Sequence, residues 1–101
     1  MKIIWSNRSL KDLDQIFNFY SKLASFEVAQ KIVTQLVEKA QILISYPQIG
    51  NLETFNKPQP FEYRYLVEGN HKLIYRISLD ENYILIARAF DSRRNPKKKK
   101  P

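Results

Sequence analysis

Hydrophobic residues recur at steps of three and four near the start of the chain, which predicts an amphipathic helix. The face that this spacing defines consists of Leu10, Leu13, Phe17 and Tyr20. The segment Ser9-Leu10-Lys11-Asp12 resembles a capping box with Asp in place of Glu, so we expect the helix to begin at Ser9. We expect it to end near Ala24.

A second amphipathic pattern follows almost at once. Its apolar face is Val28, Ile32, Leu36, Ala40 and Leu43. Ser25 is a suitable N-cap, and the helix must stop by Tyr46 because Pro47 disfavours helical geometry in the residue before it. So short a link between two helices predicts an antiparallel helical hairpin.

The rest of the chain reads as strands. Residues 2–6 are β-prone, and after an irregular stretch at 47–60 the period becomes two in residues 61–68, 71–78 and 83–90. Gly69-Asn70 suits a two-residue type II′ turn. We therefore predict a β-α-α-β-β-β order in the α+β class. A helical hairpin would pack on a small, mainly antiparallel sheet, in one domain over residues 1–92.

That turn fixes which strand residues share a face. It places Glu68 opposite His71 and Arg64 opposite Tyr75. The sequence leaves open which sheet face meets the helices, because neither is cleanly apolar. Either choice leaves Arg and Tyr together on the open face, which suits phosphate contact and base stacking. More commonly, aromatic residues in strands pack against their neighbours, and single Arg residues on sheets are solvated or form ion pairs with Glu.

Charge is concentrated at one end of the chain. The formal net charge is +7, but six basic residues and no acid lie from Arg93 onward, leaving 11 basic and 10 acidic residues in the first 92. We expect residues 93–101 to be a mobile basic segment that adds sequence-independent affinity for polyanions.

Composition excludes several kinds of chemistry. The chain has no Cys and a single His, His71, so neither a thiol nucleophile nor a His- or Cys-based metal cluster can form, and we expect no metal or cofactor. His71 flanks a turn, where a structural role is the common one. No apolar run is long enough to cross a membrane. The candidates for a general base are Asp91, Glu53 or a Tyr with a lowered pKa, and spacing alone indicates none of them.

The combined pattern resembles the RelE/ParE superfamily, the toxins of bacterial type II toxin–antitoxin systems. Tyr46-Pro47-Gln48-Ile49-Gly50 is similar to the Pro-x-x-Gly that ends the second helix in many members. Arg64, the hairpin and residues 71–77 are similar to the central strands. Residues 84–96 look like the last strand and the arginine-bearing segment after it.

The resemblance implies a cytoplasmic toxin wrapped by an acidic segment of a cognate antitoxin. RelE-like members are ribosome-dependent, metal-independent mRNA endoribonucleases, and this is the leading interpretation. ParE-like members instead inhibit DNA gyrase and are not nucleases, which is the alternative. Whether the chain is an enzyme is therefore left open.

The resemblance also implies site residues. Arg64 sits where the nucleases carry a catalytic arginine, and Arg93 or Arg94 falls near their arginine after the last strand. Phe90-Asp91 replaces the His-Tyr pair of the YoeB branch, so Asp91 is the candidate substitute in proton transfer. The expected catalytic residues are Arg64, Arg93 and Asp91, and the expected nucleic-acid contacts are Lys57, Arg76, Arg88 and Arg94.

Overall fold

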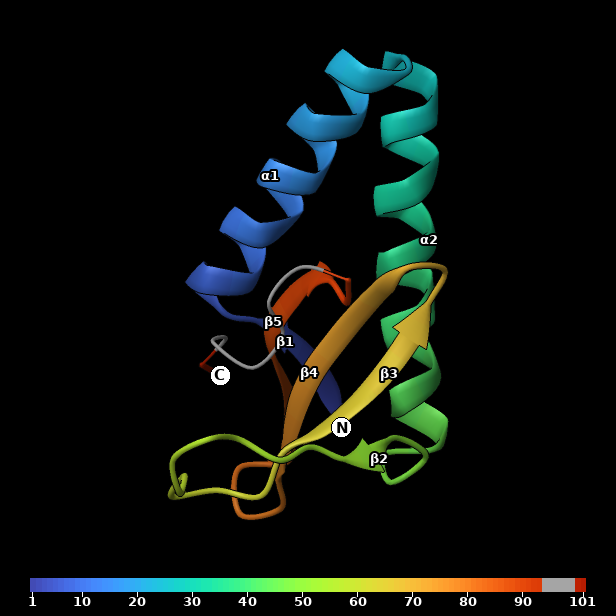
Figure 1. Cartoon of the computed structure of the whole chain (residues 1–101). Helices are drawn as coiled ribbons and strands as arrows, with labels where there is room; N and C mark the ends of the chain where they lie inside the picture. The colour runs from blue at the N-terminus through green and yellow to red at the C-terminus, as the bar shows by residue number, and fades with distance from the viewer. Residues whose placement is uncertain (94–99) are drawn as a thin grey trace.

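The computed structural model describes residues 1–93 and 100–101, and it has two layers, a helical hairpin and a five-stranded sheet (Figure 1). The elements are β1 (Lys2–Trp5), α1 (Asn7–Leu23), α2 (Phe26–Ser45), β2 (Asn51–Leu52), β3 (Arg64–Glu68), β4 (His71–Ser78) and β5 (Tyr83–Asp91). The sheet order is β1-β5-β4-β3-β2, with only β1 and β5 parallel among the paired strands. The predicted fold class is confirmed, and the short strand β2 inside the loop was not predicted.

The start of α1 corrects the predicted cap. Ser6, not Ser9, is the N-cap, because the Ser6 side chain accepts a hydrogen bond from the Ser9 amide at 3.0 Å. The Ser9 hydroxyl donates to the Ser6 carbonyl oxygen at 2.8 Å and is fully buried. The Ser6 hydroxyl also donates to the Ala87 carbonyl at 2.9 Å, so this cap joins α1 to β5.

Both helices bury a face slightly different from the predicted one. In α1, Leu10 is 48 % exposed, while Asp12 and Ile16 point inward. In α2, Val28 is exposed and its neighbour Ala29 is fully buried. The predicted Ser25 cap and the end of α2 before Pro47 are confirmed.

The sheet face that meets the helices is the one carrying Leu66, Leu73 and Tyr75, which pack with residues of both helices in the main core. The opposite face carries a smaller cluster of Tyr63, Ile74, Ala87 and Phe90, with Phe55 from the loop packed against it. The hairpin register is as predicted. Gly69 has φ +59° and Asn70 does not have a positive φ, as a type II′ turn requires.

Candidate functional site

The helix-free face of the sheet holds two of its cations against aromatic rings. The Arg76 guanidinium lies 4.1 Å from the Phe61 ring centroid and donates to the Tyr83 hydroxyl at 3.4 Å. The Lys72 ammonium lies 4.1 Å from the Tyr65 ring centroid and forms an ion pair with Glu53. Arg76, predicted to contact nucleic acid, therefore lies on the face that the helices leave uncovered.

Arg64 is engaged with the loop that follows α2. Its guanidinium donates to the Gly50 carbonyl at 2.9 Å and to the Gln48 carbonyl at 3.4 Å, and it lies 3.6 Å from the Glu62 carboxylate. The Gly50 carbonyl therefore occupies a guanidinium donor of Arg64 that would otherwise be available to a substrate phosphate. In this position Arg64 fixes the loop against β3.

Tyr75 lies opposite Arg64 on β4 and also holds this loop, through hydrogen bonds of its hydroxyl group. Its hydroxyl accepts a hydrogen bond from the Gly50 amide at 2.9 Å and donates to the Pro47 carbonyl at 2.7 Å. Burial raises the pKa of Tyr75, so the phenol stays protonated and keeps donating. A Cβ on Gly50 would lie 2.6 Å from the Tyr75 hydroxyl, so the loop approaches β4 closely only because residue 50 is glycine.

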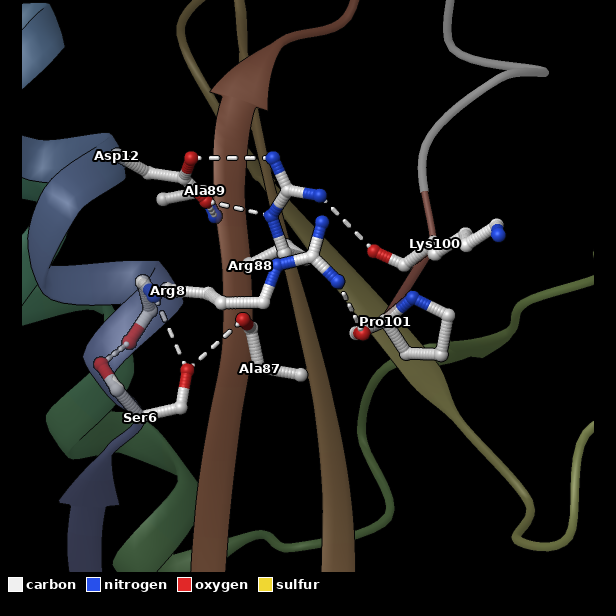
Figure 2. A network of polar contacts seen from close by, with 9 residues as sticks. Ser6, Arg8, Asp12, Ala87, Arg88, Ala89, Lys100 and Pro101 are labelled. Carbon is white, nitrogen blue, oxygen red and sulfur yellow. Dashed lines mark hydrogen bonds and ion pairs between the residues drawn. The ribbon is translucent and has the colours of Figure 1, made fainter.

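Arg88 points into the protein, toward α1 (Figure 2). Its Nε and terminal nitrogen donate to the two Asp12 carboxylate oxygens at 2.8 and 3.1 Å, and both side chains are more than nine-tenths buried. Asp12 also accepts a hydrogen bond from the Ala89 amide at 2.9 Å. The pairing of β1 with β5 ends at Ile86, so Asp12 supplies the Ala89 amide with a partner beyond the end of β1. This placement argues against the expected contact of Arg88 with nucleic acid.

The same region holds the last described residues of the chain. Arg88 donates to the Lys100 carbonyl at 3.0 Å, and Arg8 donates to the main-chain oxygen of Pro101 at 3.1 Å (Figure 2). Two residues of the predicted mobile segment therefore contact the start of α1 and β5. Residues 94–99 of that segment, including Arg94, lie outside the described residues.

Asp91 and Arg93 pair with each other. The Arg93 guanidinium binds both carboxylate oxygens of Asp91, at 2.9 and 2.6 Å. The hydrogen bond from the Arg93 side chain, followed by smaller effects that include its charge, lowers the pKa of Asp91 to about 2. A carboxylate with so low a pKa is a weak base at neutral pH, so the pairing reduces the capacity of Asp91 to accept a proton.

His71 lies next to this pair, and its burial there was not predicted from the sequence. It pairs with Asp91 across β4 and β5, is 5 % exposed, and contacts the Tyr20 ring edge to face at 5.9 Å between centroids. Burial lowers its pKa, which favours the neutral ring. The position of Asp91 opposite His71 follows from the β4–β5 register, but a bulge shifts that register between Ile74 and Tyr75, so simple alternation along the strands does not predict it.

The predicted site residues do not form one cluster. In the sheet register, Arg64 lies opposite Tyr75 of β4 and Asp91 lies opposite His71 of β4. Tyr75 and His71 are four residues apart, so the candidates Arg64 and Asp91 are separated by about 13 Å along the strand direction. Lys57 is exposed in the loop before β3. Within residues 1–93 and 100–101, no group of three or more His, Asp or Glu side chains is placed to hold a metal. No helix in the same residues has the length and hydropathy to cross a membrane.

Comparison with known proteins agrees with this fold. A solved chain from the chromosomal ParDE toxin–antitoxin system of P. aeruginosa is 25% identical, with a TM-score of 0.72 over 90% of this chain and 95% of that one. A YoeB/ParE toxin from Agrobacterium tumefaciens (16% identity, TM-score 0.55, 90% and 98% covered) shares the fold. So does the YoeB dimer from Staphylococcus aureus (19%, 0.53, 89% and 94%). No curated protein sequence matches.

The family assignment rests on a match over most of the chain. Residues 3–96 match the family described as the ParE toxin of the type II toxin–antitoxin system, parDE. The resemblance to the RelE/ParE superfamily inferred from sequence is confirmed. The family implies an antitoxin as partner. The chain belongs to the ParE toxin family of type II toxin–antitoxin systems.

Proposed function

We propose that this toxin acts by binding its target, as an inhibitor of DNA gyrase, and not by cutting mRNA. The observation that carries the proposal is that three arginines expected to face phosphate are occupied within the chain. Arg64 donates to loop carbonyls, Arg88 is buried against Asp12, and Arg93 is bound by Asp91. Releasing Arg64 or Arg88 would break contacts that stabilise the fold, whereas the Arg93 pair is exposed and contributes little to stability.

The candidate general bases are also poorly suited to proton transfer. Cleavage through the ribose 2′-hydroxyl needs a base within hydrogen-bonding reach of that group. The lowered pKa of Asp91 makes it a weak acceptor, and Tyr75 is fully buried with a raised pKa. His71 is neutral enough to serve as a base, but its ring is almost wholly enclosed beneath α1.

Gyrase is proposed as the target because the family matched is ParE, whose members the sequence resemblance associates with gyrase inhibition. The similarity to a chain of the P. aeruginosa ParDE system supports the same choice over the YoeB-like structures, which match with lower identity and TM-score. We place the protein in the cytoplasm with this target. For its antitoxin we propose an acidic segment that wraps the chain and whose charge complements the six basic residues from Arg93 onward.

The test compares the two activities on one protein preparation. Purified toxin is added to gyrase with relaxed plasmid, scoring supercoiling and trapped DNA cleavage complexes, and to ribosomes translating a defined mRNA, scoring cleavage by primer extension. We expect loss of supercoiling and intact mRNA. Cleavage of mRNA on ribosomes without any effect on gyrase would overturn the proposal.

The ribosome-dependent endoribonuclease is kept as the second candidate because of one observation. Arg76 and Lys72 lie on the helix-free face beside Phe61 and Tyr65, an arrangement that can bind phosphate and stack bases. If this face cuts mRNA, Arg76→Ala abolishes cleavage, whereas Lys11→Ala, which removes an exposed cation from α1, leaves it unchanged. Equal cleavage by both variants would eliminate this candidate.

A further inference from the structure

An apolar groove of about 460 Å³ lies where the end of α2 and the segment after it meet the end of β4. Its apolar side chains come from Met1, Tyr46, Ile49, Ile77 and Leu79. Tyr46, Ile49 and Leu79 are 63, 56 and 77 % exposed. Single exposed apolar residues are ordinary on a protein surface, but several of them around one groove are typical of a protein–protein contact.

The segment that carries Tyr46 and Ile49 is held in place although these side chains are exposed. The buried hydroxyl of Tyr75 accepts a hydrogen bond from the Gly50 amide at 2.9 Å, and Arg64 donates to the Gly50 carbonyl at 2.9 Å. Ordering a mobile loop on association reduces affinity. Because this segment is already fixed from within the protein, a partner that contacts it does not bear that cost.

The rim of the groove, formed by the β4–β5 turn and the end of α2, carries negative charge. Asp80 and Glu81 directly follow Leu79 in the turn, and both are exposed. Neither belongs to an ion pair among residues 1–93 and 100–101. Residues 42–45, the last turn of α2, are uncharged and leave the partial negative charge of the helix C-terminus without a basic residue in that turn.

Cations close to the groove do not cancel this charge. Lys2 lies on the opposite face of β1 from Ile3, which packs against the main core. Arg64 is bound to the loop carbonyls and lies 3.6 Å from the Glu62 carboxylate. Met1 adds one amino group against two carboxylates, so the rim favours a basic partner over an acidic one.

We propose that this groove docks an amphipathic segment of a protein partner. A large apolar side chain of the segment enters between Tyr46, Ile49 and Leu79, and flanking Lys or Arg residues pair with Asp80 and Glu81. In such contacts the apolar anchors supply most of the affinity, and the charges at the rim select the partner. Like charge disfavours an acidic antitoxin segment here, so we assign the segment to the target of the toxin. That assignment rests on the proposed function.

The test titrates a basic amphipathic peptide, acetyl-Lys-Leu-Phe-Lys-Lys-Leu-Phe-Lys-amide, into toxin labelled at its Ile and Leu methyl groups. The matched acidic peptide replaces each Lys by Glu. We expect saturable shifts of the Ile77 and Leu79 methyl signals, with half-saturation at least about fivefold lower for the basic peptide. Ile49→Ser should weaken binding of the basic peptide by at least about fivefold, because it removes a large apolar contact.

Leu23→Ser is the matched control, because Leu23 is 68 % exposed at the tip of the helical hairpin, at the opposite end of the molecule (Figure 1). It should bind the basic peptide as the wild type does. Asp80→Asn/Glu81→Gln, in the exposed turn, should remove most of the preference for the basic peptide. Equal binding by Ile49→Ser and the wild type would overturn the proposal, and so would binding of the acidic peptide as tight as that of the basic one.

Inhibition of supercoiling identifies the partner separately. Loss of inhibition in Ile49→Ser but not in Leu23→Ser would assign the groove to gyrase, whereas equal inhibition by both variants would overturn that assignment. Peptide binding by a wild type that does not inhibit gyrase would support the groove and overturn the proposed function instead.

Discussion

The buried pair of Asp12 and Arg88 gives the sharpest quantitative prediction. Asp12→Ala removes the acceptor of three hydrogen bonds, two from Arg88 and one from the Ala89 amide. The Arg88 side chain, 7 % exposed, would then stay buried without a counter-charge. Removing one partner of a buried ion pair costs about 3–5 kcal/mol. A small domain has a free energy of unfolding of about 5–15 kcal/mol, so the loss is a large part of the total.

The converse substitution should behave in the same way, and combining the two should not. Arg88→Met leaves Asp12 buried with only the Ala89 amide as a partner, at a similar cost. Asp12→Ala/Arg88→Met leaves no isolated charge, and apolar replacement of a buried pair is often close to neutral. We therefore expect the double variant to lose at least about 2 kcal/mol less than the sum of the single variants.

Urea unfolding followed by circular dichroism measures these differences. With a slope of about 1–3 kcal/mol per molar urea, Asp12→Ala should lower the midpoint by roughly 1–5 M. Asp14→Ala, on the exposed side of the same helix, is the matched control and should change stability by less than about 0.5 kcal/mol. An Asp12→Ala loss below about 1 kcal/mol, or strictly additive single and double losses, would refute the reasoning.

Three further predictions concern the loop after α2 and the titrating groups. Tyr75→Phe leaves the Gly50 amide and the Pro47 carbonyl without their partner and should cost about 1–3 kcal/mol, with faster hydrogen exchange at the Gly50 amide as the local readout. Gly50→Ala should lower Tm more than Tyr75→Phe in calorimetry, because the new Cβ would lie 2.7 Å from the Tyr65 carbonyl as well as against Tyr75; a Tm equal to that of the wild type contradicts this. Because folding lowers the pKa of His71 below 6.5, the stability present above that pH should fall as pH drops through the folded pKa. A second fall should come between about pH 3.8 and pH 2 as Asp91 is protonated. Urea midpoints against pH should show the first fall in the wild type and not in His71→Asn.

Local rules were enough to predict most of the elements. Gly69-Asn70 fixed the hairpin register, Ser25 the start of α2, and Pro47 its end, because each acts through its immediate neighbours. The start of α1 could not be decided in this way. Ser6 and Ser9 are both suitable N-caps by residue type. Ser6 also donates a hydrogen bond to Ala87, 81 residues away, and this long-range contact cannot be read from the local sequence.

The candidate site was harder to predict because the sequence shows charges without their partners. Arg88 reads as an available cation until the fold brings in Asp12 from 76 residues away. A bulge in β5 contributes as well, since Ile74 pairs with Arg88 but Tyr75 pairs with Ile86, which changes the alternation that sequence reasoning assumes. The sequence shows His71 only as the neighbour of a turn, because its contacts with Tyr20 and Asp91 come from distant parts of the chain.

The parallel pairing of β1 with β5 delays the completion of the sheet during synthesis of the chain. Lys2 aligns with Tyr83 and Trp5 with Ile86, so the first strand made has no neighbour in the sheet until the last strand exists. At about 5–20 residues per second, the ribosome needs roughly 4–16 s to make the 81 residues that separate Ser6 from Ala87. During that interval the sheet lacks the strand that lies between β1 and β4. A nascent chain therefore cannot complete this sheet until β5 has been made.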